Sequence, residues 1–286
     1  MEEYHGYIRY IEEPNTIHSK AKVFTKYFYV NVNNVDKNRL VRVYLPSTYD
    51  FSNPNKRFPV LYMFDGKNLF DDCTSFVGEW GIDETIEEMI ENGETEGIIV
   101  VGIDSAKASI DRGREMVAEE MSLKGKYSSM KGYASILGDF IFKELKPEID
   151  ELFFTLKEKE YTGVGGSSMG GLMSYYIFYK YKDYIGYSLS FSPAFFLLTN
   201  KSLKENLETY IDKPQDFGKI FFYVGGVGFE SEFVDSTKKA YEHFKKVGFS
   251  DEQVKLIINP ELEHNEKAWR RYFPEAIRYF NYLKDK

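Results

Sequence analysis

The chain has a single cysteine, Cys73, among its 286 residues, so it cannot form an internal disulfide framework. Asp71 and Asp72 directly precede Cys73, and their negative charge opposes formation of a thiolate, so we do not expect this cysteine to act as a nucleophile. The four histidines and the one cysteine do not cluster along the sequence, and the sequence therefore predicts no bound metal and no other cofactor.

The sequence also lacks basic runs and long apolar stretches. Its net charge is −8, which argues against nucleic acid and anionic membrane surfaces as partners. No apolar run is long enough to span a bilayer, and the first residues, MEEYH, do not resemble a secretory signal. We therefore expect a cytoplasmic protein. The sequence leaves open whether it forms a homo-oligomer.

What remains is a composition suited to a large core, with 43% hydrophobic and 17% aromatic residues. Short apolar runs alternate with segments of helical periodicity, which is typical of a mostly parallel sheet with helices on both faces. We expect a single domain over residues 1–286, because no linker interrupts it. Strands are predicted at residues 23–32, 39–45, 58–64, 97–103, 160–164, 185–191, 219–224 and 253–258, and helices at 80–91, 135–152, 172–181, 202–211, 232–247 and 269–283.

Residues 104–133 lose this pattern and are polar and punctuated by glycine. They form either a solvated surface excursion or a flap over the carboxyl edge of the sheet, where open α/β folds bind ligands. Arg112 and Arg114 lie in this segment. Either could bind a carboxylate of a ligand, but pairing with the neighbouring glutamates is the interpretation that we favour.

The glycine-rich segment at residues 161–171 organises the rest of the chain. Gly166, Ser168 and Gly170 fit the pattern G-x-S-x-G, a sharp turn between a strand and a helix that exposes a nucleophilic serine. Glycines are needed beside such a serine because a Cβ would collide with the neighbouring strand or helix. The alternatives are an ordinary glycine turn or a loop whose amides bind phosphate at the start of a helix.

A serine hydroxyl needs a base within hydrogen-bond reach, and the base needs an acceptor that fixes its tautomer. Of the histidines, His264 alone follows the serine in a loop directly after the last predicted strand, so it is the candidate base. The acid should follow the penultimate strand, where Glu230, Glu232 and Asp235 are all available; we choose Glu230. The order serine, acid, histidine is that of α/β-hydrolases.

The predicted oxyanion hole uses two backbone amides. One should belong to Met169, directly after the serine, and the other to the loop after the strand at 58–64. We choose Lys67 in that loop, with Gly66 as the alternative. Trp80 is a candidate substrate-binding residue, although it could instead anchor its helix.

The segments GVGGSSMGG, PVLYMFDG, GIDS with RGRE, and HNEKAW together resemble the esterase D-like family of α/β-hydrolases, from about residue 25 to the end. That family includes feruloyl and acetyl esterases, siderophore-ester hydrolases and S-formylglutathione hydrolase. The resemblance implies that Ser168 is the nucleophile and His264 the base. A turn of the type G-x-x-E in family members supports Glu230, although this chain has one residue more between Gly226 and Glu230. Asp65-Gly66 replaces the His-Gly of many hydrolases and is similar to the siderophore-esterase branch.

The sequence therefore predicts a serine carboxylic ester hydrolase that acts through an acyl-enzyme on a small acyl or aryl ester, which could be an ester of a sugar. One alternative is an acyltransferase that uses the same three residues. Another is a non-catalytic domain that binds carbohydrate or a partner through its many aromatic side chains, 23 tyrosines and 24 phenylalanines.

Overall fold

The computed structural model describes residues 2–12, 14–35 and 37–280. Within them the strands pair into one ten-stranded sheet in the order β1-β2-β3-β4-β6-β5-β7-β8-β9-β10. The strands are β1 (Glu3–Tyr4), β2 (Tyr7–Arg9), β3 (Lys22–Tyr29), β4 (Asn38–Leu45), β5 (Val60–Phe64), β6 (Ile99–Ile103), β7 (Thr162–Ser167), β8 (Tyr187–Phe191), β9 (Lys219–Val224) and β10 (Val254–Ile258). The α-helices are α1 (Ile82–Glu91), α2 (Ser109–Met116), α3 (Ala134–Phe140), α4 (Lys146–Leu152), α5 (Met169–Lys180), α6 (Asn200–Tyr210), α7 (Ser231–Val247) and α8 (Glu266–Phe280).

The sheet has a parallel part and an antiparallel part. Strands β6, β5, β7, β8, β9 and β10 run parallel to one another, whereas β1 to β4 join them through antiparallel pairs. The mostly parallel sheet predicted from the alternation of apolar runs and helical segments is therefore confirmed. Because parallel strands share one carboxyl edge, the loops after β5, β7, β9 and β10 meet there.

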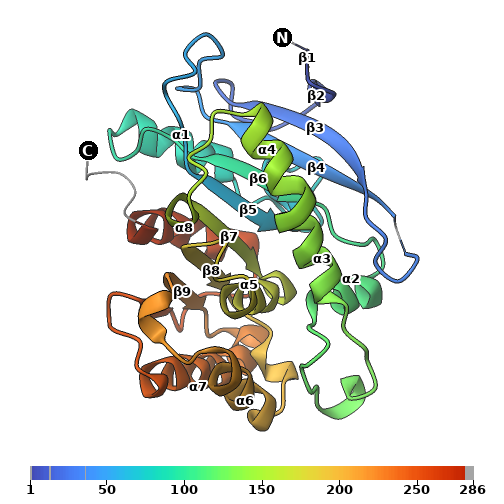
Figure 1. Cartoon of the computed structure of the whole chain (residues 1–286), viewed down its shortest axis with the longest axis vertical. Coiled ribbons are helices and arrows are strands. Elements are labelled where there is room, and N and C mark those ends of the chain that lie inside the picture. Colours follow the sequence, from blue (N-terminus) through green and yellow to red (C-terminus); the bar gives the residue numbers. More distant parts are fainter. Residues whose placement is uncertain (1, 13, 36, 281–286) are drawn as a thin grey trace.

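Helices cover both faces of the sheet, as Figure 1 shows. In β5, Val60, Tyr62 and Phe64 join one buried cluster while Leu61 and Met63 join the other, because successive side chains of a strand point to opposite faces. The first cluster packs against α3 to α7 and the second against α1 and α8. The expectation of a sheet buried on both sides is confirmed.

The predicted helix at 135–152 is interrupted. It consists of α3, a π-helical turn η3 (Ile141–Leu145) and α4, in which Pro147 occupies the first turn. Proline cannot donate a backbone hydrogen bond and clashes with the preceding turn of an α-helix. The wider π turn moves the hydrogen bonds so that Pro147 is tolerated without ending the helical rod.

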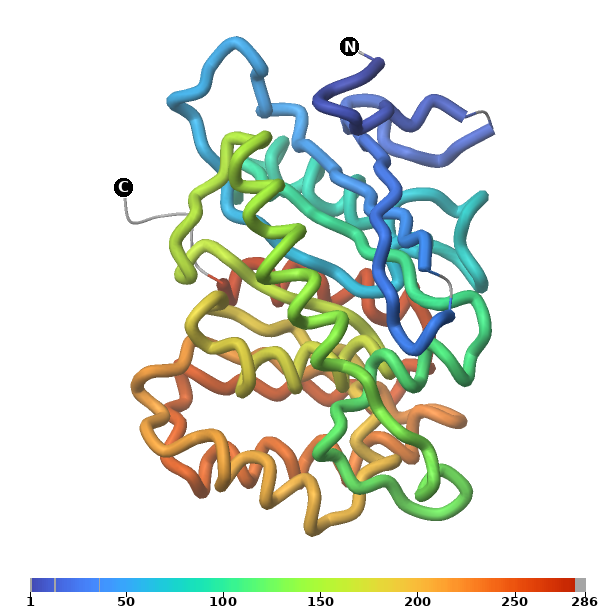
Figure 2. Tube along the Cα trace, turned by 45° about the vertical axis from the view of Figure 1, so that its right-hand side comes forward, coloured from blue at the N-terminus to red at the C-terminus, as the bar shows by residue number. Residues whose placement is uncertain are grey.

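Residues 104–133 are not without structure. They contain α2 and the short 3-10 helix η2 (Gly125–Tyr127), which the sequence did not indicate. The segment lies alongside residues 196–199 (Figure 2). There the backbone amide of Lys124 donates to the carbonyl of Leu197, and the backbone amide of Thr199 donates to the carbonyl of Ser122. It thus reaches across to the chain that follows β8.

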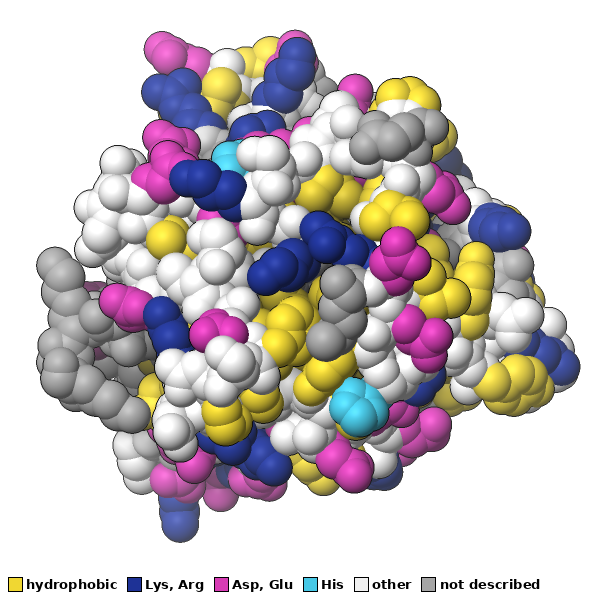
Figure 3. Space-filling model, turned by 90° about the horizontal axis from the view of Figure 1, so that it is seen from above, with side chains coloured by type: hydrophobic (Ala, Val, Ile, Leu, Met, Phe, Trp, Pro, Cys, Tyr) yellow, Lys and Arg dark blue, Asp and Glu magenta, His cyan; other side chains and the backbone are white. Residues whose placement is uncertain are grey.

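No helix in the described ranges is both long and apolar enough to cross a membrane. On the face drawn in Figure 3, acidic and basic side chains are interspersed, with hydrophobic side chains visible between them. The cytoplasmic location, the single domain and the oligomeric state stay predictions. The predicted end of the last helix, at residue 283, lies outside the described residues.

Gly171, in the first turn of α5, allows a test of the close packing behind Ser168. A Cβ on Gly171 would lie 2.7 Å from the carbonyl oxygen of Phe191 and 3.1 Å from the Cα of Pro193. These are backbone atoms that cannot rotate away, so we expect Gly171→Ala to lower the free energy of unfolding by about 1–3 kcal/mol in urea denaturation.

Gly113→Ala is the matched control, because Gly113 also lies in a helix but its added Cβ would meet only the end of the flexible Met130 side chain, with Sδ at 3.6 Å and Cε at 3.8 Å. There the usual helical preference for alanine should leave the free energy of unfolding unchanged or raise it by up to about 1 kcal/mol. Equal effects of the two substitutions would contradict the steric argument.

Candidate active site

Ser168 occupies the junction of β7 and α5 in a strained backbone conformation, with φ 57° and ψ −115°. Its amide donates to the carbonyl of Phe191 at 2.9 Å, and its carbonyl accepts from the amides of Leu172 and Ala194, each at 3.0 Å. Residues with side chains rarely adopt a positive φ, and such strain persists only where surrounding contacts enforce it. The structure thus places Ser168 on the sharp turn that the motif predicts.

The glycines of the motif are required by close contacts. A Cβ on Gly166 would lie 2.9 Å from the carbonyl carbon of Gly170, and one on Gly170 would lie 3.2 Å from Phe64 Cβ. The turn therefore packs against its own helix and against the end of β5. This contact brings the start of α5 beside the loop that follows β5.

His264 and Glu230 come together at the carboxyl edge of the sheet. The Nδ1 atom of His264 forms a short hydrogen bond with Oε2 of Glu230, whose side chain is completely buried. Glu230 ends the 3-10 helix η7 (Gly228–Glu230) after β9, whereas Glu232 and Asp235 are exposed. Of the three carboxylates that the sequence offered, Glu230 is the one that contacts the histidine.

The second oxygen of Glu230 is also satisfied. Its Oε1 accepts from the amide of Gly225 at 2.7 Å and from the hydroxyl of Ser192, which itself accepts from Trp269 Nε1 at 2.9 Å. Ser192 and Trp269 escaped the sequence analysis. Ser192 directly follows β8, just as Ser168 follows β7, and this position at the end of a parallel strand is a signal that could have identified it.

The imidazole of His264 lies against the aromatic side chains beside the serine. Its ring centre is 4.5 Å from that of Phe233 and 5.6 Å from that of Phe229, and both phenylalanines line a pocket together with Ser168. In the described residues, no hydrogen bond joins Ser168 Oγ to His264. Catalytic hydrogen bonds are often long without substrate and shorten in the complex, so the geometry keeps this pair as candidates.

The expected oxyanion donors lie at the start of α5 and in the turn after β5. Met169 begins α5, where amides have no acceptor within the helix, and Lys67 lies in the 3-10 helix η1 (Gly66–Asn68) directly after β5. A Cβ on Gly170 would lie 3.4 Å from Asp65 Oδ2, so the turn at 65–68 adjoins the start of α5. The amides of Met169 and Lys67 therefore lie on two adjoining segments.

The pocket at Ser168 has a volume of about 470 Å³, and most of its lining is apolar or aromatic. It is lined by Ser109, Ile110, Arg112, Gly113, Tyr127, Met130, Ser168, Met169, Ala194, Phe196, Leu197, Phe229 and Phe233. Six of these residues come from the segment 104–133. That segment therefore forms a wall of the pocket.

Arg112 does not pair with a neighbouring glutamate, as the sequence led us to favour. Its Nε and one terminal nitrogen donate to the two carboxylate oxygens of Asp65, each at 2.6 Å. Burial alone would raise the pKa of Asp65, but the charge of Arg112 lowers it below its ordinary value. Arg114 pairs with Asp111, so in the described residues the ion pairs of both arginines are with aspartates.

Trp80, our candidate for substrate binding, is only 2% exposed and does not line the pocket. Its ring packs against those of Phe191, Trp269 and Phe273 on the opposite face of the sheet from α5. This corrects the prediction: Trp80 anchors α1, the alternative that we had kept open.

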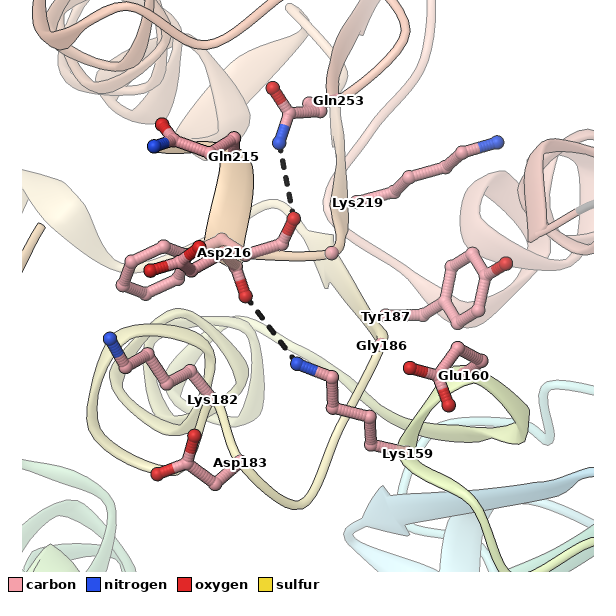
Figure 4. A pocket seen from close by; sticks show the side chains of 12 residues that line it. Lys159, Glu160, Lys182, Asp183, Gly186, Tyr187, Gln215, Asp216, Lys219 and Gln253 are labelled. Atoms are coloured by element: carbon pink, nitrogen blue, oxygen red, sulfur yellow. Dashed lines mark hydrogen bonds between the residues drawn. The ribbon is translucent and has the colours of Figure 1, made fainter. Parts of the chain in front are cut away.

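Two further features lie away from this pocket. The first is a group of three carboxylates, Glu79, Asp83 and Glu84, which could together hold a cation. Burial is the main cause that raises the pKa of Glu79 to about 7 and the pKa of Asp83 to about 9. The guanidinium of Arg270 lies 3.8 Å from a carboxylate oxygen of Glu84. A second cleft, of about 630 Å³, lies at the amino ends of β7, β8 and β9 (Figure 4). Its lysines are balanced by acidic side chains.

Comparisons with known proteins show the family and the fold of the chain. The sequence model of the family described as "Putative esterase" matches residues 33–222, which is more than half of the chain. The protein YbbA of Bacillus subtilis (strain 168), described as uncharacterized, is 23% identical over 248 residues, which cover 85% of this chain and 92% of YbbA. Endo-1,4-beta-xylanase Y of Acetivibrio thermocellus is 23% identical over 260 residues; these cover 86% of this chain but only 22% of the xylanase.

Among solved structures, a mutant of the feruloyl esterase module from Clostridium thermocellum, complexed with sinapinate, has a TM-score of 0.67 at 17% identity. The match covers 99% of this chain and 98% of that module. This likeness shows that the chain has the α/β-hydrolase fold, as the sequence predicted.

From the contacts of Ser192 we expect its hydroxyl to affect the reactivity of Ser168. Ser192→Ala removes one donor to Glu230 and leaves Trp269 Nε1 without its acceptor, so the carboxylate holds His264 less firmly. We expect the rate of labelling of Ser168 by a fluorophosphonate probe at pH 7 to fall roughly tenfold, equivalent to about 1.4 kcal/mol.

Ser188→Ala is the control, because Ser188 is equally buried on β8 but donates to the carbonyl of Ser174, away from Glu230. In Ser188→Ala, the fluorophosphonate should label Ser168 at the same rate as in the unmodified protein. An unchanged rate in Ser192→Ala would show that the hydroxyl does not support the acid.

Proposed function

The chain belongs to the Putative esterase family and is a carboxylic ester hydrolase, and from this premise we propose that it is a serine esterase in which Ser168, His264 and Glu230 act together through an acyl-enzyme. The observation that carries the proposal is the contact between His264 and the buried Glu230, beside the pocket that contains Ser168. A histidine held by a carboxylate near a strained serine is the arrangement that activates a hydroxyl.

The proposed reaction begins when Ser168 Oγ attacks the ester carbonyl. Because Nδ1 of His264 faces Glu230, its Nε2 is the atom that takes the serine proton. The amides of Met169 and Lys67 donate to the oxyanion as the tetrahedral intermediate forms. Collapse of the intermediate breaks the ester bond; the alcohol leaves with the proton from His264, and the acyl group stays on Ser168.

Water then completes the turnover. His264 takes a proton from a water molecule, which attacks the acyl-enzyme carbonyl through a second tetrahedral intermediate. The carboxylic acid leaves, and the proton returns to Ser168. Glu230 stays ionised throughout and stabilises the imidazolium that forms in each half.

The pocket favours an aryl ester as substrate. Tyr127, Phe196, Phe229 and Phe233 give it aromatic walls, and aromatic rings gain from edge-to-face and offset contacts with such walls. A volume of about 470 Å³ is large enough for a substituted aromatic acid. The solved feruloyl esterase module with sinapinate supports this choice by analogy. We propose a hydroxycinnamoyl-type ester, with the aryl group against these walls.

The first test concerns the nucleophile. Ser168→Ala should abolish turnover of p-nitrophenyl acetate, a loss of at least about 10³-fold in kcat, because no oxygen remains to form the acyl-enzyme. It should also prevent labelling by a fluorophosphonate. Circular dichroism should show a folded protein, and turnover that persists in this variant would remove Ser168 from the proposed role.

The second test concerns the acyl group. Phe229 is 55% exposed at the rim of the pocket, and Phe229→Ala removes an aromatic wall. We expect kcat/KM for p-nitrophenyl ferulate to fall roughly fivefold to tenfold, since an aromatic contact with the bound aryl group contributes about 0.5–1.5 kcal/mol, while kcat/KM for p-nitrophenyl acetate changes less than about twofold.

Tyr29→Ala serves as the control, because Tyr29 is an exposed aromatic residue of β3 outside the pocket. It should alter neither value. If the unmodified enzyme prefers the acetate, or if Phe229→Ala lowers both values equally, the proposed aryl specificity is incorrect.

A further inference from the structure

Glu266 is a buried carboxyl group close to the proposed catalytic residues, and the reaction described above does not use it. It begins α8, two residues after His264, and is only 5% exposed. Its Oε1 accepts from Asn68 Nδ2 at 3.4 Å, while Oε2 is buried without a hydrogen-bond partner in the described residues. A buried carboxylate oxygen without a partner is costly, so its presence needs a physical reason.

Asn68 connects this carboxylate to the turn after β5. Its backbone amide donates to the carbonyl of Asp65 at 2.9 Å, and its carbonyl accepts from the amide of Trp80 at 2.8 Å. Its side-chain oxygen also accepts from the amide of Phe76 at 3.2 Å. Asn68 is thus held in place immediately after Lys67, and its remaining donor points to Glu266.

Glu266 is surrounded by charged groups, among them His264 and Arg112 of the proposed site. Burial raises the pKa of Glu266, and Asp65 adds to this effect, whereas His264 and Arg112 oppose it. The small cleft that Glu266 lines also contains four other charged side chains, Asp72, Glu79, Lys267 and Arg270. An ionised Glu266 therefore interacts favourably with the imidazolium form of His264 and with Arg112.

Capping of α8 does not account for this carboxylate. The side-chain oxygen of Asn265 accepts from the amide of Ala268 at 3.0 Å, which is the usual contact of a helix N-cap. Asn265 thus supplies the cap. Glu266 instead points to the turn that carries an expected oxyanion donor.

We propose that Glu266 is a positioning residue that joins the loop bearing His264 to the turn 65–68 through Asn68, and that its charge favours the imidazolium formed during the reaction. This inference rests on the proposed roles of His264 and Lys67. Glu266 thus has two roles, the hydrogen bond to Asn68 and the negative charge that favours the imidazolium. The two roles can be separated, because a glutamine side chain retains the hydrogen bond to Asn68 but carries no charge.

The test compares Glu266→Gln with Glu266→Ala in the full chain, on p-nitrophenyl acetate. Glu266→Gln keeps an oxygen that accepts from Asn68, so we expect kcat to fall only about threefold to fivefold, with KM unchanged within about twofold. Without the negative charge, His264 loses its proton more readily, so the acidic limb of the kcat/KM profile should move to lower pH. Glu266→Ala should show the same movement and a larger loss in kcat, about twentyfold.

Asn68→Ala tests the link itself. If Glu266 acts through Asn68, the double variant that carries Asn68→Ala and Glu266→Ala should lose no more kcat than Glu266→Ala alone, because the effects of coupled residues are not additive. Glu263→Gln is the matched control: this exposed carboxylate directly precedes His264, and its neutralisation should change neither kcat nor the pH profile. Thermal denaturation and circular dichroism should show that all variants are folded.

The proposal is overturned if Glu266→Gln and Glu266→Ala both retain the kcat and the pH profile of the unmodified enzyme, or if the losses in the double variant multiply. Neither result contradicts the proposed function, provided that turnover still depends on Ser168. If turnover instead persists in Ser168→Ala, the proposed function itself fails. The two failures are therefore distinguishable.

Discussion

The backbone of Ser168 is the constraint on which the rest of the site depends. Its positive φ costs on the order of 1–3 kcal/mol and is maintained by three backbone hydrogen bonds and by the absence of side chains at Gly166 and Gly170. Gly166 also belongs to β7 and, with Gly163 and Gly165, weakens it as a strand, since glycine has a low strand propensity. The strand compensates through its place in the sheet, where β5 and β8 pair with it on both sides and all six of its residues are buried.

A second constraint is the burial of a carboxylate. Glu230 has no solvent contact, so its charge must be satisfied by donors from the protein. The amide of Gly225, the hydroxyl of Ser192 and the ring of His264 provide these donors, and Trp269 in turn holds Ser192. Ser192 also has a positive φ, of 43°. Strained residues thus follow two neighbouring strands, β7 and β8, and both serve the same small volume at the carboxyl edge.

The sequence predicted those features that depend on local patterns. Strands buried on both faces are recognisable as apolar runs, and the turn at Ser168 is recognisable because sterics dictate its glycines. The choice among Glu230, Glu232 and Asp235 required coordinates, because all three follow β9 closely and only the turn of η7 directs Glu230 inward. Trp80 was misplaced for a similar reason: its partners Phe191, Trp269 and Phe273 are more than a hundred residues away.

Helix α2 shows why the wall of the pocket was beyond sequence reasoning. Its sequence, SIDRGREM, has few apolar residues and a central glycine, and so carries little helical signal. Two ion pairs join it to distant parts of the chain: Glu115 pairs with the buried Arg39 of β4, and Arg112 pairs with Asp65. Burial raises the pKa of Glu115 to about 7 even though Arg39 opposes this, so the pair between Arg39 and Glu115 gains little net stability from being inside the protein. The contribution of the pair between Arg39 and Glu115 is therefore to hold α2 in position.

Because Asp65 begins the turn that carries Lys67, the pair between Asp65 and Arg112 fixes the wall of the pocket relative to the expected oxyanion hole. In the proposed reaction, a substrate that fits the wall would have its carbonyl group near these amides, so that binding and chemistry would depend on the same contact.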